Sequence, residues 1–349
     1  MVAMILREAG LDPTYVVGGE LNDVGSNAHA GTGEYVVAEA DESDGSFLLL
    51  KPWAAVITNV EEDHLDFFPD RDAIVEHFRR FAALLPSGGL LAVNGDDPGA
   101  RAVIGHARAR RVTFGSGEGN DYRCEDIRLI RGGAEFVLRG PGGFSGEVRL
   151  GVPGRHNVMN ATAALALAMS LGVDFDRAAR ALEAFRGVQR RFQEVETVGG
   201  IRIVDDYAHH PSEVLATLET ARNEGNERVV CVFQPHRYTR TAVLWEEFGR
   251  ALGLADRIGS VEPGKKADFV LVDAAQAHLT PRHNVPAHMV YAARGPDVVT
   301  VVVNGRIVME NRAVLTVDEE RLFAEVTARA ARLTGTTRLA ESPVREGAT

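Results

Sequence analysis

The chain has 349 residues, enough for two or three domains, and its hydrophobic content of 45% is that of an ordinary globular protein. Its 38 Lys and Arg residues against 49 Asp and Glu residues give a net charge of −11, which argues against a nucleic-acid partner because such proteins usually present a basic surface. No apolar run is long enough to cross a membrane, and the two cysteines, Cys124 and Cys231, stand far apart and fit a reducing, cytoplasmic location.

Short apolar runs alternate with helical patterns through the first part of the chain. A helix opens the chain and ends at Gly10; because no N-cap residue precedes it, we expect the chain to be the remainder of a longer protein. The segments that follow are predicted as buried strands at 34–40, 54–60 and 90–93, a helix at 70–85, and helical then extended residues at 97–108 and 112–114. This β-α-β rhythm predicts a mostly parallel, doubly wound sheet.

The chain changes character after this. Gly-rich turns separate short alternating runs at 121–151, which predicts antiparallel strands. Beyond them we expect helices at 154–171, 175–185, 211–223 and 239–252, with strands near Val195, at 201–204 and at 229–233. After about Ala255 we expect a strand at 266–273, a hairpin at 298–309 that turns on Asn304-Gly305, a helix at 318–333 and a frayed polar end.

Two acidic segments each follow a predicted strand. The first is Glu39-Ala-Asp-Glu-Ser-Asp-Gly45, and the second is Thr58-Asn-Val-Glu-Glu-Asp-His-Leu-Asp66. Ligands of open α/β sheets bind beyond the carboxyl ends of the strands, and Mg²⁺ prefers carboxylate oxygens. Each segment alone is also typical of a solvated acidic loop, and His64 alone of a hydrogen-bonded surface histidine. Their occurrence after two strands of one predicted sheet favours a shared metal site.

Four further polar segments stand at predicted element ends. Gly154–Asn160 opens a helix whose N-terminus suits a nucleotide, although simple capping by Asn157 explains it as well. The pair Arg190-Arg191 suits a phosphate or an ordinary surface role. Segments 205–213 and 234–241 add acids, histidines and arginines after two more strands. So many chemically active side chains at strand ends indicate a functional site.

In their order and spacing, these six segments are similar to the motifs of the Mur ligase family, over residues 1 to about 250. The forms ADESDGSFL, DDYAHHPSE and QPHRYTRT resemble the branch that joins L-alanine to UDP-N-acetylmuramate in peptidoglycan synthesis. The resemblance implies ATP and Mg²⁺ as cofactors. ATP would phosphorylate the substrate carboxylate, and the amine of L-alanine would attack the acyl phosphate.

The resemblance also implies roles for individual residues. The metal ligands would be Glu39 and His64. The nucleotide would be contacted at its base by His156 and Asn157, at its ribose by Asp206 and at its phosphates by Arg191. The muramyl carboxylate and the incoming alanine would be surrounded by His209, His210, Arg237 and Arg240.

The family's phosphate-binding loop, which ends in Gly-Lys-Thr, has no counterpart in these residues. The only lysines are Lys51, Lys265 and Lys266, and none of them lies between a Gly and a Ser or Thr. The resemblance implies that this loop and a UDP-binding domain precede the helix that opens the chain. We therefore expect an N-terminally truncated ligase, with little or no activity by itself, that a separate N-terminal fragment could complement.

A second resemblance begins near residue 250. Segments 250–273, 291–295 and 302–306 are similar to the end of metal-dependent amidohydrolases of the methylthioadenosine/S-adenosylhomocysteine deaminase type. His278, His283 and His288 match no standard zinc spacing, so we assign them structural or solvent-exposed roles. Two family patterns that meet within one predicted helix, near 248–252, suggest a recombined or misassembled gene.

The predicted fold class is therefore α/β. We expect an incomplete central domain with a mostly parallel sheet at 1–152 and a partial α/β third domain at 153–250. An amidohydrolase-like β segment with a C-terminal helix would follow at 251–335, and a frayed tail at 336–349. Two alternatives to a truncated ligase stay open: a protein related to amidohydrolases or deaminases, and a non-catalytic nucleotide-binding remnant.

Overall fold

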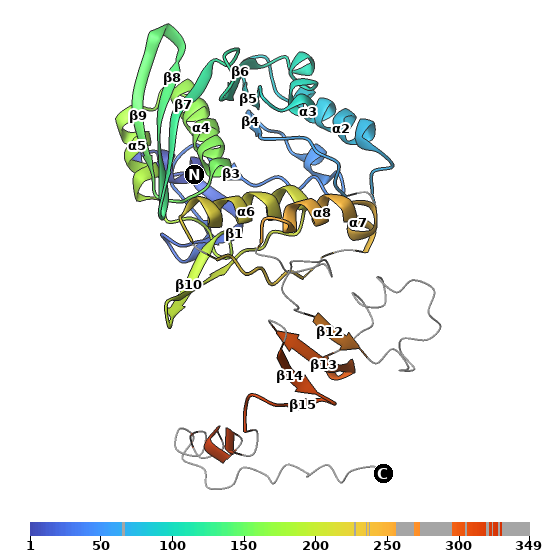
Figure 1. Ribbon diagram of the computed structural model, residues 1–349. Coiled ribbons are helices and arrows are strands. Elements are labelled where there is room, and N and C mark those ends of the chain that lie inside the picture. The colour runs from blue at the N-terminus through green and yellow to red at the C-terminus, as the bar shows by residue number, and fades with distance from the viewer. Residues whose placement is uncertain are drawn as a thin grey trace. The chain divides into compact units, whose positions relative to one another are not determined.

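The computed structural model describes residues 1–64, 67–226, 228–234, 236, 238–255, 269–272, 295–303, 306–318, 321–322, 324–326 and 329. The chain divides into two compact units, Met1–Asp256 and Arg257–Thr349, each of which is described by itself. Figure 1 shows the elements of both units. Within the described part of the chain, no helix has both the length and the apolar character needed to cross a membrane.

The first unit is built on a six-stranded sheet in the order β4-β5-β6-β7-β8-β9. The strands are β4 (Ala54–Ile57), β5 (Leu90–Asn94), β6 (Arg110–Gly115), β7 (Tyr122–Ile130), β8 (Gly133–Gly140) and β9 (Phe144–Leu150). The pairs from β4 to β7 are parallel, and the pairs from β7 to β9 are antiparallel. The predicted parallel portion and the predicted antiparallel strands thus form one continuous mixed sheet.

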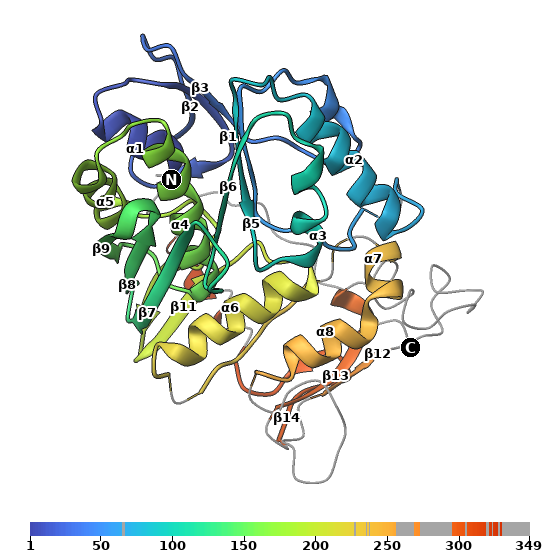
Figure 2. The same cartoon turned by 90° about the horizontal axis from the view of Figure 1, so that it is seen from above.

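Helices cover both faces of this sheet (Figure 2). One face carries α2 (Arg71–Ala83), α3 (Pro98–Arg101) and the short turns η1 (Ser46–Leu49) and η2 (Ile104–His106). The other face carries α4 (Arg155–Ser170), which α1 (Val2–Glu8) and α5 (Phe175–Ala184) flank.

Strand β5 divides its side chains between the two cores, as strand alternation requires. Leu90 and Ala92 belong to the core with α4, whereas Leu91 and Val93 belong to the core with α2, and all four are at most 1% exposed.

Local sequence sets the ends of several helices. The side chain of Asp70 caps α2 by accepting a bond from Ala73 N, and Asp174 caps α5 in the same way. Helix α1 ends as predicted at Gly10, whose φ of 80° belongs to the left-handed region. The N–H groups of Gly10 and Leu11 donate to the carbonyls of Arg7 and Leu6, both at 2.9 Å. This pair of bonds is a Schellman motif.

A separate three-stranded sheet lies in the first part of the chain, in the order β2-β1-β3. It consists of β1 (Thr14–Leu21), β2 (Ser26–His29) and β3 (Val36–Ala38). The sequence did not predict β1 and β2. It predicted a buried strand at 34–40, which is wrong in length and burial, because β3 has three residues and Val36 is 72% exposed. As an edge strand of a small sheet, β3 lies outside the central sheet that contains β4.

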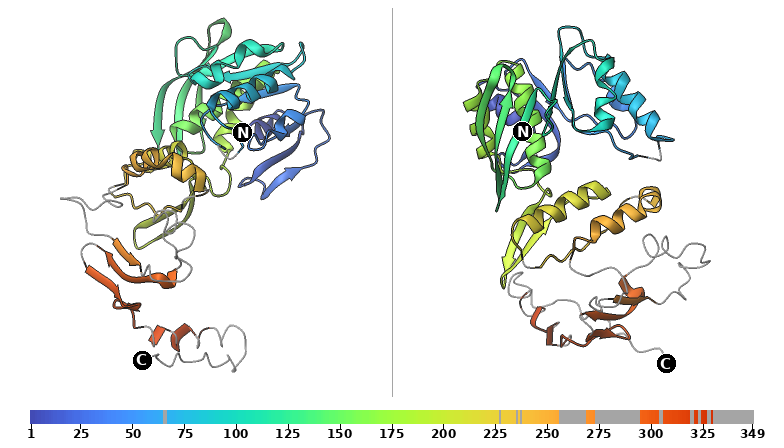
Figure 3. Two further views of the ribbon diagram at one scale, coloured as in Figure 1. Left: turned by 90° about the vertical axis from the view of Figure 1, so that its right-hand side faces the viewer. Right: turned by 45° about the horizontal axis from the view of Figure 1, so that its top comes forward.

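The rest of the first unit contains two strands and three helices. They are β10 (Gln193–Val198), β11 (Ile201–Asp205), α6 (Pro211–Asn223), α7 (Tyr238–Val243) and α8 (Trp245–Leu252). Strands β10 and β11 form an antiparallel hairpin, and α6 packs against α8 through Val214, Leu218 and Phe248 (Figure 3).

Two predictions for this region need correction. The predicted helix 239–252 is divided at Leu244, whose ψ of 27° is not helical. Residues 229–233 do not form the predicted strand. Their side chains alternate, with Val229 buried and Val232 98% exposed, but among the described residues no strand pairs with them. An alternating pattern makes a strand only when a neighbour accepts its backbone hydrogen bonds.

The second unit contains a four-stranded antiparallel sheet in the order β12-β13-β14-β15. Its strands are β12 (Phe269–Val272), β13 (Val298–Val303), β14 (Arg306–Glu310) and β15 (Ala313–Val314), and a short turn, η5 (Gly295–Asp297), precedes β13. The predicted pairing of β13 with β14 is confirmed. The predicted turn at Asn304-Gly305, the three histidines at 278–288, most of the helix at 318–333 and the tail at 336–349 lie outside the described residues.

Candidate functional site

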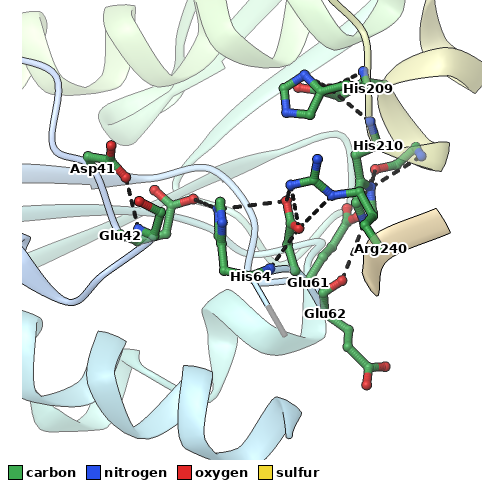
Figure 4. A network of polar contacts seen from close by, with 12 residues as sticks. Asp41, Glu42, Glu61, Glu62, His64, His209, His210 and Arg240 are labelled. Carbon is green, nitrogen blue, oxygen red and sulfur yellow. Dashed lines mark hydrogen bonds and ion pairs between the residues drawn. The ribbon is translucent and has the colours of Figure 1, made fainter. Parts of the chain in front are cut away.

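A cleft of about 430 Å³ opens beyond the end of β4. Its polar lining comes from three segments: Glu39 and Glu42 after β3, residues 58–64 after β4, and residues 210–213 at the start of α6. Figure 4 shows Glu42, His64, Glu61 and His210, which come from these three segments, as parts of one network of polar contacts. Two of the three segments follow strands, but β3 and β4 belong to different sheets, so the expectation that both segments follow strands of one sheet is wrong.

His64 lies in this cleft with a backbone φ of 54°. This left-handed conformation is uncommon for a residue other than glycine and concentrates at functional sites. Its Nε2–H donates to Glu42 Oε1 at 3.0 Å. Chiefly through this bond, Glu42 raises the pKa of His64. Its Nδ1 is buried and has no hydrogen-bond partner among the described residues.

Glu39 also lines the cleft, and a glycine holds it in place. Gly18 N donates to Glu39 Oε2 at 2.7 Å, and a Cβ on Gly18 would come within 3.0 Å of Glu39 Oε1. The two predicted metal ligands thus share one cleft. Within the described part of the chain, however, no three His, Cys, Asp or Glu side chains converge as a metal-binding group.

The positions of Glu39 and His64 are compatible with a bound Mg²⁺ ion. In the neutral form of His64, the bond to Glu42 leaves a lone pair on the unpartnered Nδ1, which is the arrangement of a metal-bound histidine with a carboxylate behind it. Mg²⁺ commonly takes only one or two protein ligands and completes its shell with water and substrate phosphates. The absence of a third ligand among the described residues is therefore compatible with this ion.

Asp63, next to His64, reaches a helix much farther along the chain. Arg240 of α7 donates from Nε to Asp63 Oδ1 at 2.8 Å and from Nη2 to Asp63 Oδ2 at 2.9 Å, across 177 residues. The Arg240 side chain is 4% exposed. Burial opposes ionisation of Asp63, but the bonds from His64 N and Arg240 outweigh it and lower the pKa of Asp63. This bidentate ion pair joins the segment after β4 to α7.

The start of α6 contacts the same segment. Ser212 Oγ donates to Glu61 Oε2 at 2.8 Å, and His210 Nε2 lies 3.3 Å from the carbonyl oxygen of Glu62. With Asp63, three consecutive acidic residues therefore contact α7 and the start of α6.

Glu213 organises the two predicted histidines. Its Oε2 accepts bonds from His209 N at 2.9 Å and His210 N at 3.1 Å, and its Oε1 accepts from Arg191 Nη1 at 3.3 Å. His210 and Glu213 form a reciprocal capping box at the start of α6. Burial would raise the pKa of Glu213, but the His209 N–H and the charges of His209 and Arg191 lower it overall.

The predicted nucleotide residues do not line the cleft. Asp206 accepts backbone bonds from Phe192 N at 2.8 Å and Ala208 N at 2.7 Å. Asn157 Nδ2 donates to Pro153 O at 2.7 Å. The capping interpretation of Asn157 is wrong, because the N-cap residue of α4 is Gly154 and, among the described residues, no side chain accepts a bond from the first helix N–H groups. Loss of hydration lowers the pKa of His156, and Asp206 opposes this effect.

The structure thus brings together part of the predicted site. Glu39, His64 and His210 line one cleft, Arg240 and Arg191 contact its lining residues Asp63 and Glu213, and His209 binds Glu213. Arg237 lies outside the described residues. The segments that contain Glu42, Asp63 and Glu213 were predicted to be functional, but these three residues were assigned no role. Asp63 stands directly beside His64 and Glu213 three residues after His210, whereas Glu42 has no histidine near it in the sequence and only its acidic segment marked it.

In comparisons with known proteins, the chain matches two family models. The Mur ligase middle domain matches residues 10–168, and the glutamate ligase domain of Mur ligases matches residues 190–317. The second match runs past residue 250, where we expected a change of family. The matches therefore give no support to an amidohydrolase-like tail.

Individual proteins agree with the family models. The chain is 47% identical over 259 residues to the UDP-N-acetylmuramate–L-alanine ligase of Desulforamulus reducens, which covers 74% of the chain and 56% of that ligase. It is 45% identical over 318 residues to the ligase of the same name from Acidothermus cellulolyticus, covering 86% of the chain and 66% of that protein.

A solved structure is also similar. The crystal structure of the UDP-N-acetylmuramate-alanine ligase MurC from Thermotoga maritima has a TM-score of 0.62 and 33% identity, and the match covers 73% of the chain and 56% of that protein. The chain spans little more than half the length of the first of these relatives and of this structure. The two domain models, the relatives and the solved structure identify the chain as a member of the Mur ligase family.

Proposed function

We propose that the chain carries the metal-binding and acceptor-binding parts of an ATP-dependent ligase that joins L-alanine to UDP-N-acetylmuramate in peptidoglycan synthesis. The observation that carries the proposal is the cleft, where His64 from the middle domain and Arg240 from the partial third domain are held by one carboxylate, Asp63. The names of relatives at 45–47% identity support the substrate class. A cytoplasmic location belongs to the proposal as well.

Mg²⁺ would be held by Glu39 and His64, with Glu42 behind the imidazole. When bound, the ion would neutralise charge on the phosphate oxygens during phosphoryl transfer. Gly18 N keeps one oxygen of Glu39 occupied at 2.7 Å, which fixes the direction of the carboxylate. The protein's contribution is therefore to orient two ligands and leave the remaining positions to phosphates and water.

The nucleotide would lie near the start of α4. His156 would be neutral at pH 7 because its pKa is lowered, so it could contact a base without bringing a charge. Asn157 and Asp206 would complete the base and ribose contacts. Asp206 already accepts two backbone bonds, so its role would be to shape the loop as well as to bind. Arg191 would turn from Glu213 toward the phosphates.

The acceptor side would be formed by His209, His210, Arg237 and Arg240. Carboxylates are recognised by guanidinium groups through paired hydrogen bonds, which suits the muramyl carboxylate and the carboxylate of alanine. Phosphoryl transfer of this kind depends mainly on positioning and charge neutralisation. Among the described residues, Asp63 holds the Arg240 side chain, and Glu213 holds the backbone of His209 and His210.

The direct test is product formation. Purified chain would be incubated with UDP-N-acetylmuramate, L-alanine and Mg²⁺-ATP. The products UDP-N-acetylmuramoyl-L-alanine and ADP would be followed by mass spectrometry. Because no lysine in the 349 residues stands in a Gly-Lys-Ser/Thr sequence, we expect turnover only when a complementing N-terminal fragment supplies that loop.

The fragment would be the N-terminal portion of the Thermotoga maritima ligase, with a matched fragment whose loop lysine is changed to alanine as control. Product from the active fragment and not from the control supports the proposal. ADP formation that needs neither UDP-N-acetylmuramate nor L-alanine would contradict it. Nucleotide binding without product in any mixture would favour the alternative of a non-catalytic nucleotide-binding protein.

A further inference from the structure

We infer that Asp63 is a positioning residue, which holds the Arg240 guanidinium so that its Nη1 stays available to donate to a ligand bound beside His64. The inference rests on the proposed function for the identity of the ligand, but not for the geometry. The motifs predicted no role for Asp63. It contacts both His64, a predicted metal ligand, and Arg240, a predicted acceptor-binding residue.

The geometry of the ion pair is specific. A guanidinium offers two pairs of donors to a carboxylate: Nε with Nη2, and Nη1 with Nη2. Asp63 takes the first pair, at 2.8 and 2.9 Å. Nη1 is left buried without a hydrogen-bond partner among the described residues. One edge of the guanidinium is therefore fixed by the protein, and the other has an unused donor.

Asp63 holds its neighbour in a related way. His64 N donates to Asp63 Oδ1 at 2.7 Å, and the His64 ring nitrogen Nε2 lies 3.7 Å from Asp63 Oδ2. His64 Nδ1, like Arg240 Nη1, is buried without a partner among the described residues. Figure 4 shows His64 and Arg240 close together in the cleft.

Buried polar atoms without partners are rare, because each one loses its bonds to water without replacement. Among the described residues, the two atoms of this kind are His64 Nδ1 and Arg240 Nη1, and Asp63 contacts both side chains. Their coincidence is explained if both atoms bind the same ligand group or its bound ion. Asp63 then determines where that group lies, although it does not touch it.

The position also joins two parts of the fold. Asp63 belongs to the segment after β4, and Arg240 to α7, so the ion pair forms only when α7 lies against the cleft. The neighbouring contact between Glu61 and Ser212 is more exposed, since the Glu61 side chain is 40% exposed and the Arg240 side chain 4%. Ligand binding through Arg240 is therefore coupled to this docking by Asp63.

The test uses the full chain labelled with ¹⁵N-arginine and follows the side-chain Nε–H signal of Arg240 by NMR. The signal is assigned by its disappearance in Arg240→Lys. In the unmodified chain we expect a shifted signal that exchanges slowly with water, because the proton is buried in an ion pair. In Asp63→Asn we expect fast exchange and loss of the shift, while signals of other arginines, such as that of Arg202, stay unchanged.

Glu61→Gln is the matched control, since it removes one acidic charge from the same segment and should leave the Arg240 signal as it is. Asp63→Glu tests the case in which Asp63→Asn does not fold: it keeps the charge but lengthens the side chain, and the signal should move partway. An Arg240 signal that is the same in Asp63→Asn or Asp63→Glu as in the unmodified chain would overturn the inference.

A second arm tests the consequence for binding. With the complementing N-terminal fragment present, addition of UDP-N-acetylmuramate and L-alanine should move the Arg240 signal in the unmodified chain. Asp63→Asn should weaken this binding by roughly 10- to 100-fold, by analogy with the loss when a residue that orients a metal ligand is removed. Unweakened binding in Asp63→Asn would also overturn the inference. If the unmodified chain does not bind even with the fragment present, the proposed function fails, whereas the comparison of exchange rates still decides the role of Asp63.

Discussion

At the scale of single residues, carboxylates whose oxygens bind backbone N–H groups hold the loops of the site. Asp206 accepts from Phe192 N and Ala208 N, so it joins the loop before β10 to the loop before α6. Its neighbour Asp205 instead forms an exposed ion pair with Arg190 at 3.2 Å. The two adjacent acids therefore contribute differently to the stability of the fold, although the sequence alone does not distinguish them.

This difference gives a prediction for stability. Asp206→Asn replaces an accepting oxygen by an amide nitrogen that cannot accept, so one backbone N–H loses its partner, and we expect a loss of about 1–3 kcal/mol in the free energy of unfolding. Asp205→Asn removes only an exposed ion pair and should change it by about 0–1 kcal/mol. Urea unfolding of both variants measures this. Equal losses would contradict the assigned contacts.

A second prediction concerns Asp12. Its carboxylate accepts from Thr32 N and Thr32 Oγ1, both at 2.8 Å, and lies 3.1 Å from His29 Nε2. Mainly through the Thr32 backbone bond, the pKa of Asp12 is lowered from 3.8 to about 2. A depressed pKa in the folded state means that the ionised group stabilises the fold above the unfolded-state pKa, and that this contribution disappears as the pH falls from 3.8 toward 2.

Carbon NMR titration of the Asp12 carboxyl group measures this pKa directly. We expect a midpoint near the value of about 2, and a rise toward the ordinary value of 3.8 in Thr32→Ala, which removes the hydroxyl donor. A midpoint of Asp12 in the unmodified chain that equals the ordinary value would show that the loop is not held as described.

At the scale of elements, the sequence predicted those whose signals are local. Asp70, Asp174 and Pro211 mark helix starts, and Gly10 marks a helix end, because capping depends on neighbouring residues. Strands β1 and β2 were missed because Thr14–Leu21 contains two glycines and Ser26–His29 is polar, so neither has a strong strand pattern. Whether residues 229–233 find a pairing neighbour is decided by distant residues, which local alternation does not report.

The same limit applies to the site. The motifs predicted that Glu39 and His64 lie together, and both line one cleft, although the strands before them belong to different sheets. His210, which was predicted for the acceptor side, lines the same cleft. The partner of Arg240 could not be predicted, because Asp63 lies 177 residues away and three other acids precede or follow it in the same segment. Pairings over such distances depend on the packing of whole elements.

The start of α4 gives a prediction at this scale. Gly154 has φ of 101°, and a Cβ there would lie 2.5 Å from His156 Cε1 and 2.7 Å from Thr220 Oγ1. Gly154→Ala should therefore suffer both backbone strain, about 1 kcal/mol, and steric overlap, about 1–3 kcal/mol more. Thermal or urea unfolding measures the sum.

Gly172→Ala is the matched control for this prediction. Gly172 also has a positive φ, of 91°, but nothing lies within 4 Å of its added Cβ. It should therefore show the backbone strain alone, and the difference between the two variants isolates the overlap with His156 and Thr220. Indistinguishable losses would mean that the contact at the start of α4 is looser than described.

At the scale of the whole molecule, the first measurement is thermal unfolding with and without Mg²⁺-ATP. If the proposed site binds, the ligand stabilises the native state by about 2.7 kcal/mol at a concentration of 100 times its Kd, and the transition moves to higher temperature. We expect this rise in the unmodified chain and a smaller one in His64→Ala, which removes a proposed metal ligand. A transition that does not respond to Mg²⁺-ATP in either protein would count against nucleotide binding by this chain.

The alternation of β5 has a consequence for how the first unit unfolds. Leu90 and Ala92 complete one core, and Leu91 and Val93 complete the other, so neither core can be exposed to water without removing the strand from both. The cores on the two faces of the sheet are therefore expected to unfold together, and a substitution that loosens one core also destabilises the other. A deletion of one residue before Leu90 would exchange the inward faces of the strand, and would disrupt two cores at once.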